Sequence, residues 1–233
     1  MTTTQTPMQA RLEAVRERIA KACDRAGRAR DSVTLVAVTK TFSAQAVREA
    51  VAAGQCHFGE NYVQEGVEKI AGFIGAHDLV WHFIGPIQSN KTRPIAQNFQ
   101  WVHTIDRERV ARRLAEQRDP QLPPLCVCIE VNISGEASKS GVSPADLIKL
   151  AETVAAMPRL QLRGLMSIPE PTPDEALSRR RFAQLRELRD SLNARGHSMD
   201  TLSMGMSADM DAAIAEGATL VRIGTAIFGE REK

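Results

Sequence analysis

Short apolar runs alternate with longer amphipathic stretches along most of the chain. Runs rich in β-branched residues are typical of buried strands, and stretches with apolar residues three and four positions apart are typical of helices. The pattern predicts strands at 33–39, 57–59, 79–85, 101–105, 125–131, 162–168, 201–204 and 220–225. It predicts helices at 44–53, 63–74, 91–97, 107–117, 144–157, 174–195 and 208–216, several opened by a capping residue such as Ser43, Asp106, Ser143 or Ser207.

This order of elements predicts an α/β protein with a single (β/α)8 TIM barrel. A doubly wound open sheet, which has the same alternation of strands and helices, is the alternative. An extra amphipathic helix is predicted at 8–27, with Leu12, Val15, Ile19 and Cys23 on one stripe, and we expect it to cover a barrel end. No linker divides the chain, so residues 1–233 are expected to form one domain, with residues 1–30 as a tail and the extra helix.

Composition and charge narrow the class of protein. Of the 233 residues, 43% are hydrophobic and 25% are charged, as in a globular protein with a sizeable core. The net charge of +2 is too balanced for a surface built to bind nucleic acid or an acidic membrane. Residues 1–8 lack a signal-peptide pattern, and no stretch reaches the roughly 18 apolar residues of a membrane span. We expect a cytoplasmic protein, and the lack of an exposed apolar heptad favours a monomer.

The four cysteines lack the paired spacing of a zinc site: Cys23, Cys56, Cys126 and Cys128. Cys126 and Cys128 are expected on one face of a strand, with no histidine pair nearby to complete a metal site. We interpret all four as reduced cysteines of the core.

Lys40 is the only cation in the apolar run 33–40. An ammonium group beside apolar walls loses hydration, so its pKa falls and the neutral amine becomes available to attack an aldehyde. Lys40 is therefore a candidate Schiff-base lysine. The alternative is that the strand ends at this residue and the ammonium group simply reaches water.

Two loops near the C-terminus have the features of phosphate sites. In TIM barrels the active site lies at the C-terminal ends of the strands, and the loops after strands 7 and 8 commonly hold phosphate. In the loop 203–207, Gly205 permits a tight turn and Ser207 is placed to cap the next helix, with Met206 between them. After strand 8, Gly224 permits close backbone approach and Thr225 offers a hydroxyl group.

Closure of the barrel would make strand 8 the neighbour of strand 1, so Lys40 and Arg222 should face the same mouth. A planar ligand could then place its phosphate at the two loops, its aldehyde at Lys40 and its ring against Arg222. Pyridoxal 5′-phosphate has these three groups, and enzymes bind it as a lysine imine with an Asp or Arg opposite the pyridine nitrogen. The alternative for Arg222 is an ion pair with Glu60 or Glu130.

Motifs along nearly the whole chain carry a family resemblance: 36–40 (VAVTK), 58–65 (FGENYVQE), 81–91 (WHFIGPIQSNK), 164–167 (GLMS), 203–207 (SMGMS) and 221–229 (VRIGTAIFG). With these motifs the chain resembles the YggS/PROSC family of pyridoxal phosphate-binding homeostasis proteins, whose barrel is similar to the N-terminal domain of alanine racemase. The resemblance implies that Lys40 forms the Schiff base and that Arg222 faces the pyridine nitrogen. It also implies that Ser207, Gly224 and Thr225 hold the phosphate, and Asn61 is a further pocket candidate.

The residues favour a carrier over a catalyst. An arginine opposite the ring leaves the pyridine nitrogen unprotonated, which makes the ring a poor electron sink. Racemisation needs a second base. By the family resemblance, alanine racemase takes this base from a tyrosine of its C-terminal domain, and we expect no such domain here because the chain ends at Lys233. The single tyrosine, Tyr62, is interpreted as a half-buried packing residue. His82 and His103 could serve as the base in principle, but we interpret His82 as a hydrogen-bonded core or rim imidazole.

We therefore predict a pyridoxal phosphate carrier or buffer without catalytic turnover, with apo pyridoxal phosphate enzymes as recipients. Lys91 and Lys139 are candidate secondary acceptors during release, against the alternative of solvated surface lysines. Three rival functions stay open. They are a pyridoxal phosphate-dependent amino-acid racemase, a barrel aldolase that uses Lys40 on a sugar phosphate, and a binding module whose output is a protein contact.

Overall fold

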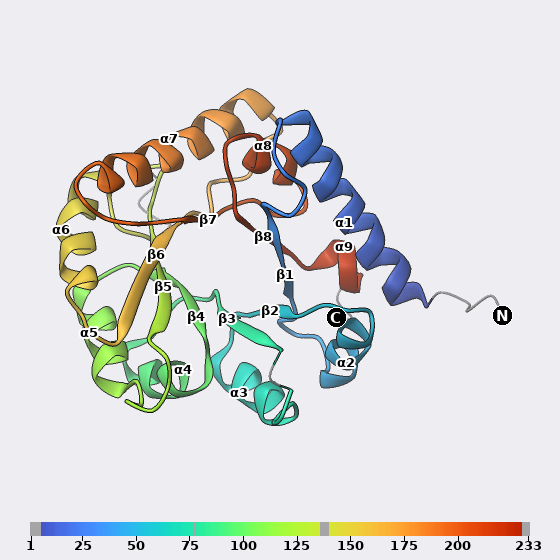
Figure 1. Ribbon diagram of the computed structural model, residues 1–233, viewed down its shortest axis with the longest axis horizontal. Helices are drawn as coiled ribbons and strands as arrows, with labels where there is room; N and C mark the ends of the chain where they lie inside the picture. The colour runs from blue at the N-terminus through green and yellow to red at the C-terminus, as the bar shows by residue number, and fades with distance from the viewer. Residues whose placement is uncertain (1–5, 77, 136–139, 230–233) are drawn as a thin grey trace.

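The computed structural model describes residues 6–76, 78–135 and 140–229. Within them, eight parallel strands form a closed barrel in which each strand pairs with the next and β8 pairs with β1 (Figure 1). The strands are β1 (Thr34–Val38), β2 (His57–Glu60), β3 (Val80–Phe83), β4 (Trp101–Ile105), β5 (Leu125–Glu130), β6 (Leu160–Met166), β7 (Thr201–Ser203) and β8 (Leu220–Ile223). The predicted closed barrel is confirmed, and the open-sheet alternative is wrong.

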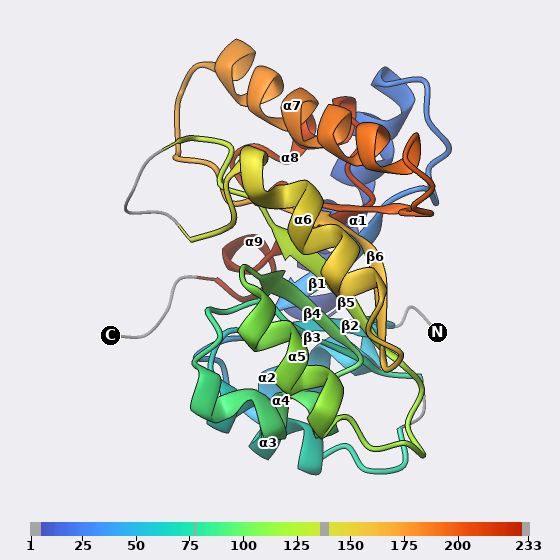
Figure 2. The ribbon, with the colours of Figure 1, turned by 90° about the vertical axis from the view of Figure 1, so that its left-hand side faces the viewer.

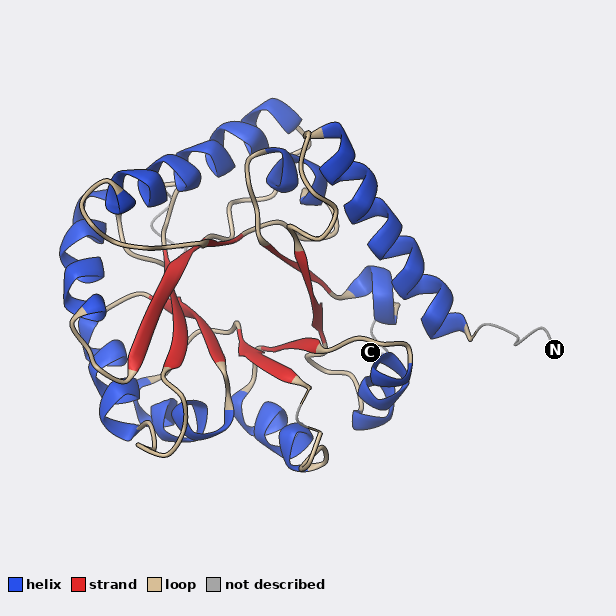
Figure 3. Cartoon of the chain, in the orientation of Figure 1, coloured by secondary structure: helices blue, strands red, loops and turns tan. Residues whose placement is uncertain are grey.

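Helices surround the strands in the predicted order (Figure 3). They are α2 (Ala44–Ala52), α3 (Val63–Ala71), the 3-10 turn η1 (Ser89–Lys91), α4 (Thr92–Asn98), α5 (Glu108–Gln117), α6 (Pro144–Ala155), α7 (Glu175–Asn193), α8 (Met210–Ala215) and α9 (Thr225–Phe228). Seen from the side, α5 and α6 lie over the outer face of the strands (Figure 2). The strand predicted at 220–225 ends earlier than expected, because Thr225 already begins α9.

The extra N-terminal helix α1 (Pro7–Arg25) begins at a capping box formed by Thr6 and Gln9. Its buried stripe includes Leu12, Val15 and Ile19, as predicted. The helix does not cover a barrel end, so that expectation was wrong: it packs in the outer ring against α8, α9 and α2 (Figure 1). The reason is that, up to residue 229, where the described part of the chain ends, β8 is followed only by the short helix α9, which leaves the place of an eighth ring helix to α1.

The loop between β7 and α8 differs from the prediction. Ser207 does not cap the helix, because α8 begins at Met210 and has Asp209 as its N-cap residue. The Asp209 carboxylate instead accepts a hydrogen bond from the main-chain N–H of Met206, at 2.6 Å, which closes the loop on itself. Side-chain caps are present as predicted at Ser43 and Ser143, whereas α5 has Arg107 rather than Asp106 as its N-cap residue.

The barrel has an apolar outer face and a partly polar interior. Phe83 points to the helices, where its ring lies 5.4 Å from that of Phe99. Because side chains alternate along a strand, the neighbouring His82 points the other way. His82 and His103 are fully buried and hydrogen-bonded to each other, which confirms the interpretation of His82 as a core imidazole.

The backbone that follows β1 is held in an uncommon conformation. Thr41 has a φ of 69°, a region that β-branched residues rarely occupy. Its main-chain N–H donates to the Glu65 carboxylate of α3, at 2.5 Å. This contact fixes the peptide that comes directly after Lys40.

A buried lysine holds the peptide on the other side of Lys40. Lys69 of α3 is 5% exposed, and its Nζ donates to the Thr39 carbonyl at 2.6 Å. The same Nζ donates to the carboxylates of Glu60 and Glu65, at 2.8 and 2.6 Å. Burial raises the pKa of Glu60, and the hydrogen bonds from Lys69 and Thr39 oppose that rise. The ion cluster of Lys69, Glu60 and Glu65 thus holds the main chain on both sides of Lys40.

We predict that Lys69→Met lowers the free energy of unfolding by about 3–5 kcal/mol at neutral pH, because it leaves Glu60 charged, buried and unpaired. In this variant the folded protein would hold a proton on Glu60 more tightly than the unfolded chain does. The loss is therefore largest above the folded pKa of Glu60 and shrinks as pH falls toward the ordinary value of 4.5. Urea unfolding at several pH values measures both effects.

The matched control is Lys21→Met. Lys21 also pairs with a carboxylate, Glu17, but both side chains are more than half exposed, at 63% and 57%. An exposed pair contributes at most about 1 kcal/mol, so this variant should unfold almost like the unmodified protein. Equal losses in the two variants would contradict the role given to Lys69.

Candidate functional site

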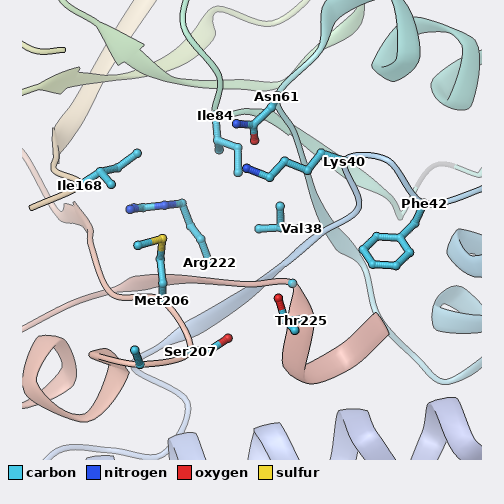
Figure 4. Close-up of a pocket in the computed structure, with 12 residues that line it drawn as sticks. Val38, Lys40, Phe42, Asn61, Ile84, Ile168, Met206, Ser207, Arg222 and Thr225 are labelled. Carbon is cyan, nitrogen blue, oxygen red and sulfur yellow. The ribbon is translucent and has the colours of Figure 1, made fainter. Parts of the chain in front are cut away.

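A cavity of about 310 Å³ opens at the C-terminal ends of the strands (Figure 4). All seven residues predicted from the sequence line it: Lys40, Asn61, Met206, Ser207, Arg222, Gly224 and Thr225. Five residues that the sequence analysis did not single out complete the lining: Val38, Phe42, Ile84, Ile168 and Ala208. The volume is in the range of pockets for small molecules and cofactors.

Lys40 enters the cavity from the loop after β1. Its side chain extends toward the space between Asn61 and Arg222 (Figure 4). Arg222 comes from β8, and the pairing of Val36 with Arg222 places the two strands side by side. The expectation that Lys40 and Arg222 face the same mouth is confirmed.

Arg222 is 4% exposed and is held by two neutral oxygen atoms. Its Nη1 donates to the Ser203 hydroxyl at 2.7 Å, and its Nη2 donates to the Ser167 carbonyl at 2.9 Å. Neither serine was predicted as part of the site. Burial lowers the pKa of Arg222 to about 10, so the guanidinium group remains charged at neutral pH.

The alternative partners of Arg222 lie elsewhere. Glu60 pairs with Lys69. Burial, with the charge of Asp106, raises the pKa of Glu130 to about 7, while Arg222 acts on that carboxyl only as a nearby charge that opposes the rise. In the described part of the chain Arg222 forms no ion pair with either glutamate. Its remaining N–H groups can therefore serve a ligand.

Two turns at the cavity present main-chain donors. Gly205 has a φ of 95°, and a Cβ atom there would lie 2.6 Å from the Ala213 side chain, so only glycine fits this turn. Within the described residues, the N–H groups of Ser207, Ala208 and Thr225 donate to no protein acceptor. Outward-facing main-chain N–H groups are what an anion such as phosphate requires.

Two arginines of α1 hold these turns from behind. Arg18 donates to the Ser207 carbonyl at 2.8 Å, and Arg11 donates to the Ile227 carbonyl of α9 at 3.2 Å. Arg18 also pairs with Asp211 of α8. The extra helix therefore positions both loops and adds positive charge near them.

The remaining walls are suited to a flat ring with polar edges. Ile84 and Ile168 supply apolar surface (Figure 4). The Oδ1 atom of Asn61 is buried and accepts no hydrogen bond from the described residues. Buried polar atoms normally have a partner, so this oxygen is a ready acceptor for a ligand. Together, an amine, a guanidinium, an amide and an anion-binding surface fit pyridoxal phosphate.

Several other residues considered from the sequence lie outside this lining. Tyr62 is 57% exposed, so its interpretation as a half-buried packing residue was wrong. His82 and His103 lie inside the barrel and do not line the cavity. Lys91 is exposed in η1 and does not line the cavity either. Lys139 lies outside the described residues.

The cysteines are free thiols, but only two belong to the core as predicted. Cys23 and Cys128 are buried, Cys126 is half-buried, and Cys56 is exposed. No group of His, Cys, Asp or Glu side chains in the described residues could hold a metal ion. No described helix is both long and apolar enough to cross a membrane.

Comparison with known proteins agrees with this geometry. Residues 10–232 match the sequence family described as alanine racemase, N-terminal domain. A protein of Pseudomonas aeruginosa named pyridoxal phosphate homeostasis protein is 60% identical, with 94% of this chain and 93% of the relative covered. A protein of the same name from Vibrio cholerae is 57% identical, with 97% of each chain covered.

The fold of this chain is also similar to that of a solved structure. PipY of Synechococcus elongatus, with pyridoxal phosphate bound, has a TM-score of 0.84 and 37% identity, with 95% of this chain and 100% of that chain covered. These matches confirm the family resemblance stated from the sequence motifs. The chain belongs to the pyridoxal phosphate homeostasis proteins, a family whose barrel has the fold of the alanine racemase N-terminal domain.

Proposed function

We propose that this protein binds pyridoxal 5′-phosphate in the cavity and acts as its carrier or buffer in intracellular homeostasis. One observation carries the proposal: Lys40, Arg222 and the two turns with free N–H groups line one cavity. A sugar-phosphate aldolase would need the lysine and the turns, but it would not need a buried arginine directed at a ring. The structure of PipY with pyridoxal phosphate bound supports the same ligand.

Each side chain has a distinct role in this proposal. When bound, pyridoxal phosphate supplies an aldehyde and a conjugated ring that can accept electrons. Lys40 would bind the aldehyde reversibly as a Schiff base, and Arg222 would donate to the ring nitrogen. Ser207, Gly224 and Thr225 would hold the phosphate, with Met206 and Asn61 closing the remaining sides.

The lining also favours a carrier over a racemase. Among the described residues that line the cavity, Lys40 is the only side chain that could act as a general base. Racemisation requires a base on each face of the substrate carbon. The relatives are likewise named as homeostasis proteins rather than as enzymes.

Other parts of the proposal extend beyond the cavity. Residues 1–233 would act as one cofactor-binding domain, with residues 1–30 as its N-terminal tail and helix, and the protein would be a cytoplasmic monomer. Apo pyridoxal phosphate enzymes would be the recipients of the cofactor. Lys91 and Lys139 would serve as secondary acceptors during release.

We expect titration with pyridoxal phosphate to produce the visible absorption of a lysine-bound pyridoxal, and Lys40→Ala to abolish it. Lys149→Ala is the control, because this lysine is exposed on α6, away from the cavity. An absorption band that is unchanged in Lys40→Ala would exclude the proposed binding mode. A protein that cannot be loaded at all would favour the aldolase instead.

A separate prediction concerns the secondary acceptors. Borohydride reduction of the loaded protein followed by peptide mapping should place the cofactor mainly at Lys40. In Lys40→Ala, the remaining label should move to Lys91 or Lys139. Label that is absent from both lysines in this variant would contradict their role and would leave the carrier function itself untouched.

A further inference from the structure

A continuous chain of hydrogen bonds starts at Arg222 and runs through the barrel interior. Arg222 Nη1 lies 2.7 Å from Ser203 Oγ, and Ser203 Oγ lies 2.7 Å from His103 Nδ1. His103 Nε2 lies 2.9 Å from His82 Nδ1, and His82 Nε2 lies 3.0 Å from His57 Nδ1. The chain therefore connects β8, β7, β4, β3 and β2.

The arginine sets the direction of every bond in this chain. A guanidinium group can only donate, so Ser203 Oγ must accept from Arg222. The Ser203 hydroxyl hydrogen has no other acceptor among the described residues, so it points to His103 Nδ1. A neutral imidazole with one accepting nitrogen donates from the other. His103 therefore donates from Nε2 to His82, and His82 donates from Nε2 to His57.

The two central histidines are neutral at neutral pH. Burial, with the charge of Arg222, lowers the pKa of His103 to about 3. Burial and the two neighbouring imidazoles lower the pKa of His82 well below its ordinary value. A neutral state of both rings is what the one-directional pattern requires.

The far end of the chain lies at the other pole of the barrel. His57 is partly exposed and lines a separate cavity together with Arg16, Arg30 and Gln55. Its Nε2–H is thus the terminal donor of the chain. Each member turns its acceptor toward Arg222 and its donor away from it, so the dipoles of the whole chain point their negative ends at the buried charge.

We propose that Ser203, His103, His82 and His57 form a dipole chain that stabilises and orients the Arg222 guanidinium in place of a carboxylate. An ion-paired carboxylate would take two N–H groups and also neutralise the charge. Ser203 and Ser167 likewise take two of the five guanidinium N–H groups, which leaves 5 − 2 = 3 without an acceptor among the described residues, but they leave the charge in place. The four residues are positioning residues, and only their effect on the ligand rests on the proposed function.

The first test measures tautomers in the unloaded protein. Long-range 1H–15N spectra distinguish the two ring nitrogens of a neutral histidine. At pH 7 we expect His57, His82 and His103 all to carry their hydrogen on Nε2, with single substitutions used to assign the signals. An Nδ1–H tautomer or a charged ring at His82 or His103 would overturn the proposal. This measurement requires no bound cofactor, so it stands even if the proposed function fails.

The second test is a double-mutant cycle in pyridoxal phosphate affinity. Ser203→Ala removes the first link, and we expect it to weaken binding about tenfold or more, because the lost hydrogen bond is made to a charged group. In the Arg222→Met background the same substitution should change affinity less than about twofold. Equal effects of Ser203→Ala in the two backgrounds would show a merely structural role.

Cys128→Ala is the control for the loss of a small buried side chain. Cys128 lies on β5, which pairs with the His103 strand β4, and is fully buried, but it is not part of the chain. We expect its substitution to leave both the tautomers and the affinity within about twofold of the unmodified protein. If it weakened binding as much as Ser203→Ala does, the affinity effect would come from barrel packing, and the proposal would fall.

Discussion

The pairing of β1 with β8 is the contact on which the candidate site depends. Main-chain register joins Val36 to Arg222 and Ala37 to Ile223, so the ends of the first and last strands meet. Lys40 and Arg222 are 222 − 40 = 182 residues apart in the sequence, and only closure of the barrel brings them to one cavity. If the sheet were open between β1 and β8, every helix and strand could still form, but Lys40 and Arg222 would no longer lie at one cavity.

The protein stabilises the buried cations Lys69 and Arg222 in opposite ways. Lys69 lies among the carboxylates of Glu60 and Glu65, so its charge is satisfied within the protein and serves to fix the backbone around Lys40. Arg222 instead contacts the neutral oxygen atoms of Ser203 and Ser167. A charge held by dipoles keeps its field, whereas a charge paired with a carboxylate is largely neutralised. Arg222, the cation that would act on a ligand in our proposal, therefore contacts no counter-ion among the described residues.

The sequence predicts what depends on local pattern. Strand and helix periods identified the barrel, the strand-end position identified Lys40, and alternation along β8 identified Arg222. One failure is local: Ser207 was expected to cap a helix, but Asp209 occupies that position. The other contacts that were missed join side chains that meet across the fold. Directly hydrogen-bonded members of the dipole chain lie up to 100 positions apart in the sequence, and no local period connects Ser203 with His103.

The place of α1 shows the same limit and adds a functional consequence. The sequence predicts the apolar stripe of α1, but an apolar stripe alone does not determine which surface of the protein the helix packs against. That surface exists because β8 is followed by the four-residue helix α9, and filling it brings Arg11 and Arg18 against the two turns of the cavity. A helix recruited to complete the outer ring thereby also shapes the anion-binding side of the site. In this barrel, packing of the ring and geometry of the cavity cannot vary independently.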